Sequence, residues 1–146
     1  MVMKVKDSKD ILSSILKTTQ MGQVGIRSVM RLPLRSTLRT ALKDQLAEYD
    51  TIEQEAQSIA SSRGWVLDEL DPVAKSMAKM VTRTRLSFGN IDSKVAAMMI
   101  QGNTRGIIKG YKNVHQLFSS DERVSTLSQK LLDCESANIK QMQGYL

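Results

Sequence analysis

Residues 95–118, VAAMMIQGNTRGIIKGYKNVHQLF, and residues 127–142, LSQKLLDCESANIKQM, decide the fold. In the first stretch, one line of side chains recurs at steps of three and four: Ile100, Thr104, Ile107, Tyr111 and Val114. The second stretch places Glu135 and Asn138 inside an otherwise apolar line. Both spacings are helical, so we expect two helices of a bundle with polar groups held at its centre.

A second face of the first stretch consists of Gly102, Gly106 and Gly110. Glycine allows another backbone to approach closely, so we expect this face to pack against a crossing helix or another subunit. The charged neighbours Arg105 and Lys109 rule out a membrane-spanning pair of helices here.

The same periodicity predicts further helices over about residues 8–30 and 34–62, and a last helix that ends near Gly144. The first predicted stripe is Leu12, Ile15, Leu16, Thr19, Gly22, Gln23, Ile26 and Met30. The second is Leu38, Leu42, Gln45, Tyr49, Ile52, Ala56 and Ile59, and the last is Val124, Leu127, Leu131, Glu135, Asn138 and Met142. Pro33 and Gly64 are expected to stop the first two helices, and Ser119 and Ser120 to cap the last.

Residues 72–118 allow two arrangements. Asp71 and Pro72 read as an N-cap and a first helical residue, which predicts a short crossing helix over about 72–88 and a break at Gly89–Asn90. One continuous helix also fits, because the apolar stripe keeps its phase across the break, but it would be roughly 70 Å long. The hairpin is more compact, since it lets large residues of 72–88 face the glycines.

The composition is that of one globular domain, so we expect a single helical bundle over residues 1–146. Two prolines and eight glycines leave little room for the many turns of an all-β fold. The longest apolar run, Val95 to Ile100, is far shorter than the ~20 residues of a membrane span. The chain starts with a polar segment and has a single cysteine, Cys134, which favours a cytoplasmic location.

The net charge of +6 is unevenly distributed. Residues 44–71 hold eight acidic residues and one basic residue, whereas residues 72–118 hold eight basic residues and one acidic residue. An acidic and a basic helix that neighbour each other explain this pattern. The alternative is a basic surface for nucleic acid or an anionic membrane, although few aromatic residues are present for base stacking.

If the chain turns near residue 34 and near residues 119–120, polar residues of all four long helices lie at a similar level along the bundle. This arithmetic pairs Gln23 with Gln45 and Thr104 with Glu135. The whole predicted layer is Gln20, Gln23, Gln45, Glu48, Gln101, Thr104, Glu135 and Asn138. Four-helix bundles place metal ions in such layers.

The order of two long helices, a short crossing element and two more helices resembles the ferritin-like superfamily, including small uncharacterised bacterial four-helix-bundle proteins. Residues 88–92, FGNID, and 98–102, MMIQG, are similar to the turn and third core helix of those proteins. The resemblance implies an all-α, ferritin-like four-helix bundle with the crossing helix added. It also implies a di-metal site, with Glu on the first and third core helices and Glu-x-x-His on the second and fourth.

This sequence departs from the di-metal pattern. Carried over by position, the single glutamates fall at Gln20 or Gln23 and at Gln101. The two Glu-x-x-His motifs fall at residues 45–48 or 48–51 and at 135–138, where no histidine stands. Amides are weak ligands, so we expect no metal, with iron or manganese bound only under the alternative of an unusual ligand set. The layer is then expected to be a vestigial hydrogen-bonded network, in which Glu135 can pair with Arg105 or Lys109.

The sequence therefore predicts a non-catalytic structural or interaction protein that forms a homo-oligomer. An unknown protein partner is left open. One alternative is a metal-binding or oxidoreductase bundle, and the other is a nucleic-acid or membrane-surface binder. The sole histidine, His115, has no second ligand at metal spacing. Cys134 lies beside Asp133 and Glu135, which disfavour a thiolate.

Overall fold

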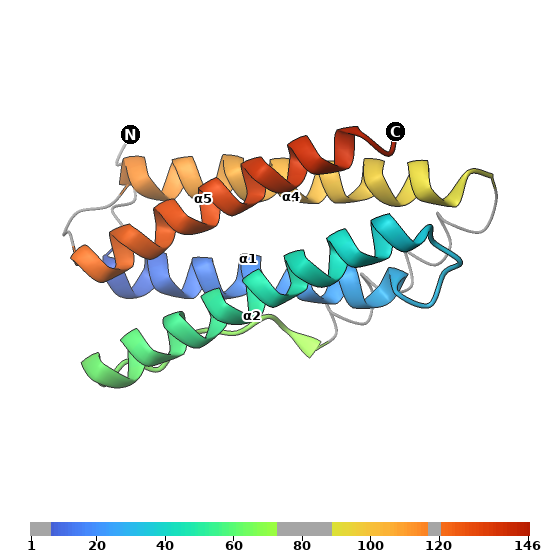
Figure 1. Ribbon diagram of the computed structural model, residues 1–146. Coiled ribbons are helices and arrows are strands. Elements are labelled where there is room, and N and C mark those ends of the chain that lie inside the picture. The colour runs from blue at the N-terminus through green and yellow to red at the C-terminus, as the bar shows by residue number, and fades with distance from the viewer. Residues whose placement is uncertain (1–6, 73–88, 117–120) are drawn as a thin grey trace.

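The computed structural model describes residues 7–72, 89–116 and 121–146. Across these ranges the long elements are four helices that lie side by side (Figure 1). They are α1 (Ser8–Val29), α2 (Ser36–Arg63), α4 (Ile91–Gln116) and α5 (Glu122–Gln143). The expected all-helical bundle is confirmed. None of these helices has the length and apolarity needed to cross a membrane.

Contacts at the helix ends fix the direction of each helix. Arg35, just before α2, pairs with Asp92 at the start of α4, with Nε and Oδ2 2.8 Å apart. At the other end of the bundle, Asp121 before α5 meets Ser8 of α1 and Arg63 of α2. Hence α1 and α5 run one way and α2 and α4 the other, as two antiparallel hairpins joined by one long connection. The helices α2 and α4 occupy opposite corners, and each packs on α1 and α5.

The helix boundaries follow from local chemistry. Asp7 caps α1 in a reciprocal pair with Asp10, and Gly64 ends α2 with a left-handed φ of 67°. Gly89 has a φ of 92°, and the Asn90 side chain accepts a hydrogen bond from the Ser93 amide, so α4 begins at Ile91. This break excludes one continuous helix over 72–118. Of the predicted crossing helix, about 72–88, only Pro72 belongs to the described residues.

One predicted cap is wrong. The cap of α5 is Asp121, whose side chain accepts hydrogen bonds from the Arg123 and Val124 amides, instead of Ser119 or Ser120. A carboxylate is at least as good an N-cap as a serine hydroxyl, and it also suits the positive end of the helix dipole.

The connection after α2 follows α1. The Asp68 amide donates to the Ser13 hydroxyl at 3.1 Å, and the Leu70 amide donates to the Gln20 side-chain oxygen at 2.9 Å. Because α1 satisfies these backbone groups, residues 65–70 are held without forming a helix of their own.

The predicted stripes of α1, α2 and α5 are confirmed as core. Their innermost members have no measurable exposure: Leu12, Leu16, Leu38, Leu42, Ile52, Ala56, Ile59, Val124 and Met142. Spacing of three and four therefore identified the buried face of three helices.

The predicted apolar face of α4 is wrong. Tyr111 and Val114 are 54% and 47% exposed, and Thr104 is exposed as well. The face that is buried instead consists of Val95, Ala96, Met99, Asn103, Gly106 and Asn113. Small and polar residues therefore line the inner side of this helix.

The close approach of α5 explains this choice. A Cβ on Gly110 would lie 2.6 Å from Cδ2 of Leu132, and one on Gly106 would overlap the carboxyl group of Glu135. These two glycines therefore pack against α5 of the same chain, which corrects the expectation of a crossing helix or another subunit as their partner. Gly102 differs, because no atom of residues 7–72, 89–116 and 121–146 lies within 4 Å of the position of its Cβ.

Candidate functional site: a polar centre beside an interhelical cavity

Tyr49 of α2 lies at the centre of the bundle. Its ring packs over Gly22 of α1, where a Cβ would lie 2.6 Å from Cζ, and its hydroxyl donates to Oδ1 of Asn103 in α4 at 2.9 Å. The Asn103 amide in turn donates to the Met99 carbonyl at 2.7 Å. Burial, with a smaller contribution from Glu135, raises the pKa of Tyr49 above its ordinary value, so the phenol keeps its proton.

Glu135 of α5 is the buried acid of this centre, with 2% exposure. Its Oε1 atom is buried and has no hydrogen-bond partner among the described residues. Desolvation raises the pKa of Glu135 from 4.5 to about 8, so the carboxyl group is mostly protonated at neutral pH.

The expected ion pair of Glu135 with Arg105 or Lys109 is not formed within the described ranges, where four other ion pairs are found. The face that α4 turns toward Glu135 is that of Gly106, while Arg105 and Lys109 are exposed. The charge is lost by protonation instead, which costs less than burying an unpaired carboxylate.

Cys134 and Asn138 extend the polar centre along α5. The Cys134 thiol donates to Oε2 of Glu48 at 2.9 Å, and the Asn138 amide lies 3.7 Å from the sulfur. Burial and the neighbouring Glu48 raise the pKa of the Cys134 thiol. A thiol that keeps its proton is a poor nucleophile and a poor metal ligand.

Gln45 of α2 supplies a second unpartnered oxygen. The side chain is 2% exposed, and its amide nitrogen donates to Oε1 of Gln141 at 2.9 Å. Its own Oε1 is buried and accepts no hydrogen bond in the described part of the chain. Buried polar atoms are nearly always satisfied, so two such oxygens in one bundle call for an explanation.

Gln45, Tyr49 and Glu135 all line one cavity of about 520 Å³. Its walls are α1 and α4, and four of the wall residues are glycines: Gly22, Gly25, Gly102 and Gly106. Met21, Met98 and Met99 add apolar surface, and Lys17 and Arg105 add positive charge. This volume falls within the range of pockets that hold small molecules.

The predicted layer is only partly brought together. Gln23 donates to Asp50 at 2.9 Å, and Gln20 donates to Glu53 at 3.4 Å and Glu69 at 3.2 Å. Gln20 and Gln23 are both buried, with 6% and 4% exposure, but their amides donate to acidic side chains of α2 and of the connection after it instead of to Gln45 or Glu48. The pairs 20–53 and 23–50 are centred between Ser36 and Thr37, whereas the prediction took residue 34 as the centre of the turn. The difference arises because residues 30–35 form the connection and α2 begins only at Ser36.

The predicted members from α4 also miss the centre. Thr104 and Gln101 are exposed, and the Thr104 hydroxyl donates to the Ile100 carbonyl at 2.7 Å. Gly106, half a turn further along, lies opposite Glu135. The prediction therefore found nearly the right level along α4 for the contact with Glu135, but it chose the wrong face of the helix.

Sequence reasoning missed the roles of Tyr49 and Asn103. Tyr49 was placed in the core as an apolar residue, although a buried tyrosine hydroxyl needs a partner. Asn103 lies four residues after Met99 and three before Gly106. This helical spacing places the three residues on one face of α4, and it is the pattern from which the burial of Asn103 could have been predicted.

The donors around Glu135 do not resemble a metal centre. Amide, phenol and thiol groups surround this acid, and His115 is exposed elsewhere on α4. No group of three or more His, Cys, Asp or Glu side chains suited to a metal ion occurs in residues 7–72, 89–116 and 121–146.

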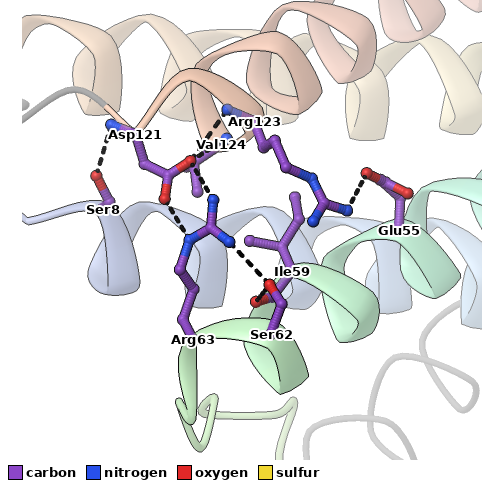
Figure 2. Close-up of polar contacts among 8 residues, drawn as sticks. All are labelled: Ser8, Glu55, Ile59, Ser62, Arg63, Asp121, Arg123 and Val124. Atoms are coloured by element: carbon purple, nitrogen blue, oxygen red, sulfur yellow. Dashed lines mark hydrogen bonds and ion pairs between the residues drawn. The ribbon is translucent and has the colours of Figure 1, made fainter.

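A second polar cluster, at the end of the bundle, has a different character (Figure 2). Asp121 accepts from Nε and Nη2 of Arg63 at 2.6 and 3.1 Å, and its amide donates to the Ser8 hydroxyl at 3.2 Å. Arg123 pairs with Glu55 at 2.9 Å. Complementary charges thus connect three helices, and this cluster is structural.

Comparisons with protein-family models, with curated proteins and with solved structures give no match to this chain.

Proposed function

We propose that this chain is a non-catalytic, ferritin-like helical-bundle protein whose interhelical cavity binds a small molecule. The observation that carries the proposal is the pair of buried, unpartnered oxygens, Oε1 of Glu135 and Oε1 of Gln45, beside one cavity of about 520 Å³. Leaving such atoms unsatisfied is costly, and a bound molecule with hydrogen-bond donors removes that cost.

The helix directions support the ferritin-like part of the proposal. Two antiparallel hairpins joined by one long connection are the arrangement of ferritin-like bundles. A polar centre at mid-depth also fits a site from which metal ligands have been lost. The single cysteine is free and buried, which fits a cytoplasmic location.

The protonation states support a binding role over catalysis. Acid–base and nucleophilic catalysis need a group that gains or loses a proton near neutral pH in contact with a partner group. Here the pKa values of Tyr49 and Cys134 are both raised well above neutrality. Glu135 has a pKa near 8, but no described hydrogen-bond partner positions it for proton transfer.

The test is binding of 2-naphthol, a small apolar fluorophore, to the wild type and to Gly102→Leu. A leucine at position 102 would extend into the cavity, and its Cβ would meet no atom of the described residues within 4 Å. We expect saturable binding by the wild type and at least tenfold weaker binding by the variant. The matched control, Thr104→Leu, adds the same side chain to an exposed position outside the cavity and should bind as the wild type does.

Elemental analysis of the purified protein separates this proposal from a metal-binding bundle. Iron, manganese or zinc at one atom or more per chain would overturn the proposal, since the cavity would then have to be viewed as part of a metal site. We expect less than a tenth of that amount.

Self-association belongs to the same proposal. Ile108, Tyr111 and Val114 lie on the outer side of α4 with exposures of 51%, 54% and 47%. Large apolar side chains gathered on one face favour contact with another copy. Sedimentation at tens of micromolar should show an oligomer that Tyr111→Glu weakens, and a wild type that is only monomeric would contradict this expectation.

A further inference from the structure

We infer that the ligand of this cavity is a planar aromatic acid that carries an O–H or N–H donor at the end opposite its carboxylate. This inference rests on the proposed function, because it names the class of molecule that the same cavity takes.

The walls favour a flat molecule. Gly25 of α1 and Gly102 of α4 both line the cavity, and the nearest atom of the described residues to a Cβ on either is at 4.0 Å or beyond. At these two positions the wall of the cavity is backbone without a side chain, which leaves flat surface on both α1 and α4. Met21, Met98 and Met99 border the same space, and thioether sulfur makes favourable contacts with aromatic rings. An aromatic ring therefore fits better than a branched aliphatic chain.

The buried side requires a donor. Among the described residues, two side-chain oxygens lack partners: Oε1 of Gln45, which is an acceptor, and Oε1 of Glu135, whose protonated carboxyl group offers one acceptor and one O–H donor. An apolar group placed there would leave both unsatisfied, whereas a ligand hydroxyl or ring N–H satisfies at least one. A cationic donor is disfavoured, because the chain carries a net charge of +6 and Lys17 and Arg105 line the same cavity.

The other side favours an acid. Arg105 is exposed and Lys17 half-buried, so these cations lie nearer to solvent than Glu135 and Gln45 do. A ligand carboxylate beside them keeps part of its hydration and gains a charge-assisted contact. The polar character of the cavity thus changes from uncharged amide and carboxyl groups at its buried side to cations at its exposed side.

The experiment uses three naphthalenes of the same shape and follows their fluorescence during titration with the full chain at pH 7. The probe 6-hydroxy-2-naphthoate carries both groups, 2-naphthoate lacks the hydroxyl, and 2-naphthol lacks the acid. We expect the first to bind about tenfold more tightly than 2-naphthoate, the effect of one buried hydrogen bond. It should bind about threefold more tightly than 2-naphthol, the effect of a partly exposed charge pair.

Two variants assign these preferences to residues. Glu135→Met removes the acceptor at similar volume and should bring the affinity ratio of 6-hydroxy-2-naphthoate to 2-naphthoate close to one. Arg105→Gln changes an exposed side chain without risk to folding and should remove only the preference for the acid. Far-ultraviolet circular dichroism checks that each variant is folded. If Glu135→Met is not, the wild-type ligand series and Arg105→Gln still decide the outcome.

The outcomes separate the two proposals. If 2-naphthol and 2-naphthoate bind in a way that Gly102→Leu blocks, but the hydroxyl brings no gain, the ligand class is wrong and the binding function stands. If the wild type binds none of the three at millimolar concentration, the ligand class and the binding function are both overturned.

Discussion

The cluster around Asp121 and the centre around Glu135 are two polar regions of one bundle, and they treat their acids in opposite ways. Asp121 accepts hydrogen bonds from Arg63 and from two backbone amides. These contacts, the one from Arg63 above all, hold the pKa of Asp121 below its usual range. Glu135 pairs with no cation of the described residues, and burial raises its pKa to about 8.

The two regions differ in how their charged groups are accommodated. At the end of the bundle, charges are paired where water can still reach them, and the pairs tie α1, α2 and α5 together. At the centre, the bundle has no ion pair for Glu135 among the described residues and keeps a buried, neutral carboxyl group beside a cavity. The first arrangement stabilises the fold, whereas the second leaves a buried polar atom without a partner among the described residues, which lowers stability. Stability measurements on variants of both regions test this contrast.

The largest effect is expected from the pH dependence of Glu135. Folding raises its pKa from 4.5 to about 8, so between these values the folded state holds more protons than the unfolded state. The free energy of unfolding therefore falls as pH rises through this window, by up to about 1.4 kcal/mol per pH unit and on the order of 4 kcal/mol in all. Glu135→Gln should lack this fall. Urea denaturation of both proteins at pH 5 to 8 measures the difference.

The control for that experiment is Asp133→Asn, which changes an exposed acid one turn or less from Glu135. Its stability should follow the wild-type pH dependence. Parallel curves for the wild type and Glu135→Gln would show that Glu135 is not the buried neutral acid described above.

Gly106→Leu should come next in size. Its side chain would occupy the place of the Glu135 carboxyl group, so the α4–α5 contact must open, at a cost of about 2–3 kcal/mol. Gly102→Leu is the matched control on the same helix, and it should be neutral or stabilising by up to about 1 kcal/mol, because leucine favours helix more than glycine does. Thermal denaturation followed by circular dichroism measures both. Equal effects of the two substitutions would contradict the close packing at Gly106.

A smaller effect is expected from Asp121→Ala at the end of the bundle. The loss of the α5 N-cap should cost about 1 kcal/mol, and Asp121→Asn should recover most of it, since asparagine also caps helices. Urea denaturation of the two variants makes this comparison. If Asp121→Asn loses as much stability as Asp121→Ala, the loss comes from the contact with Arg63 and not from the helix cap.

The smallest effect is expected from Arg123→Gln. Arg123 and Glu55 are 43% and 44% exposed, so their ion pair should contribute at most about 0.5 kcal/mol. Added salt should remove even that difference between the variant and the wild type. A loss above 1 kcal/mol would mean that the end cluster acts as a cooperative network.

The sequence was a good guide wherever burial depended on apolar side chains. The lines through Leu38 and Ile52 of α2 and through Leu127 and Met142 of α5 are inside, as their spacing predicted. In α4 the most apolar line leads to Tyr111 and was wrong, because contact with α5 requires small residues more than apolar ones. A pattern of hydrophobicity does not record how closely two helices approach.

The candidate site was predicted in part. Glu135, Asn138 and Gln45 were placed correctly at the centre, since each interrupts a strong apolar stripe. Gln20 and Gln23 were assigned to the same layer by counting from the turn, but a shift of a few residues in the connection moved them to acidic partners. Side-chain length adds to this error, because a glutamine reaches partners more than one turn away. The cavity itself depends on the distance between α1 and α4, which no local pattern encodes.

The buried phenol of Tyr49 gives the molecule an optical indicator of its own centre. Because its pKa is raised by burial, its phenolate absorbance should develop only when the bundle opens, and phenylalanine at the other two tyrosines, Tyr111 and Tyr145, makes Tyr49 the sole source of that signal. The single tryptophan, Trp65, lies in the connection after α2, where its amide bonds to the Ala60 carbonyl. Ultraviolet absorbance of the one and fluorescence of the other thus follow two parts of the chain in the same sample, without an added label.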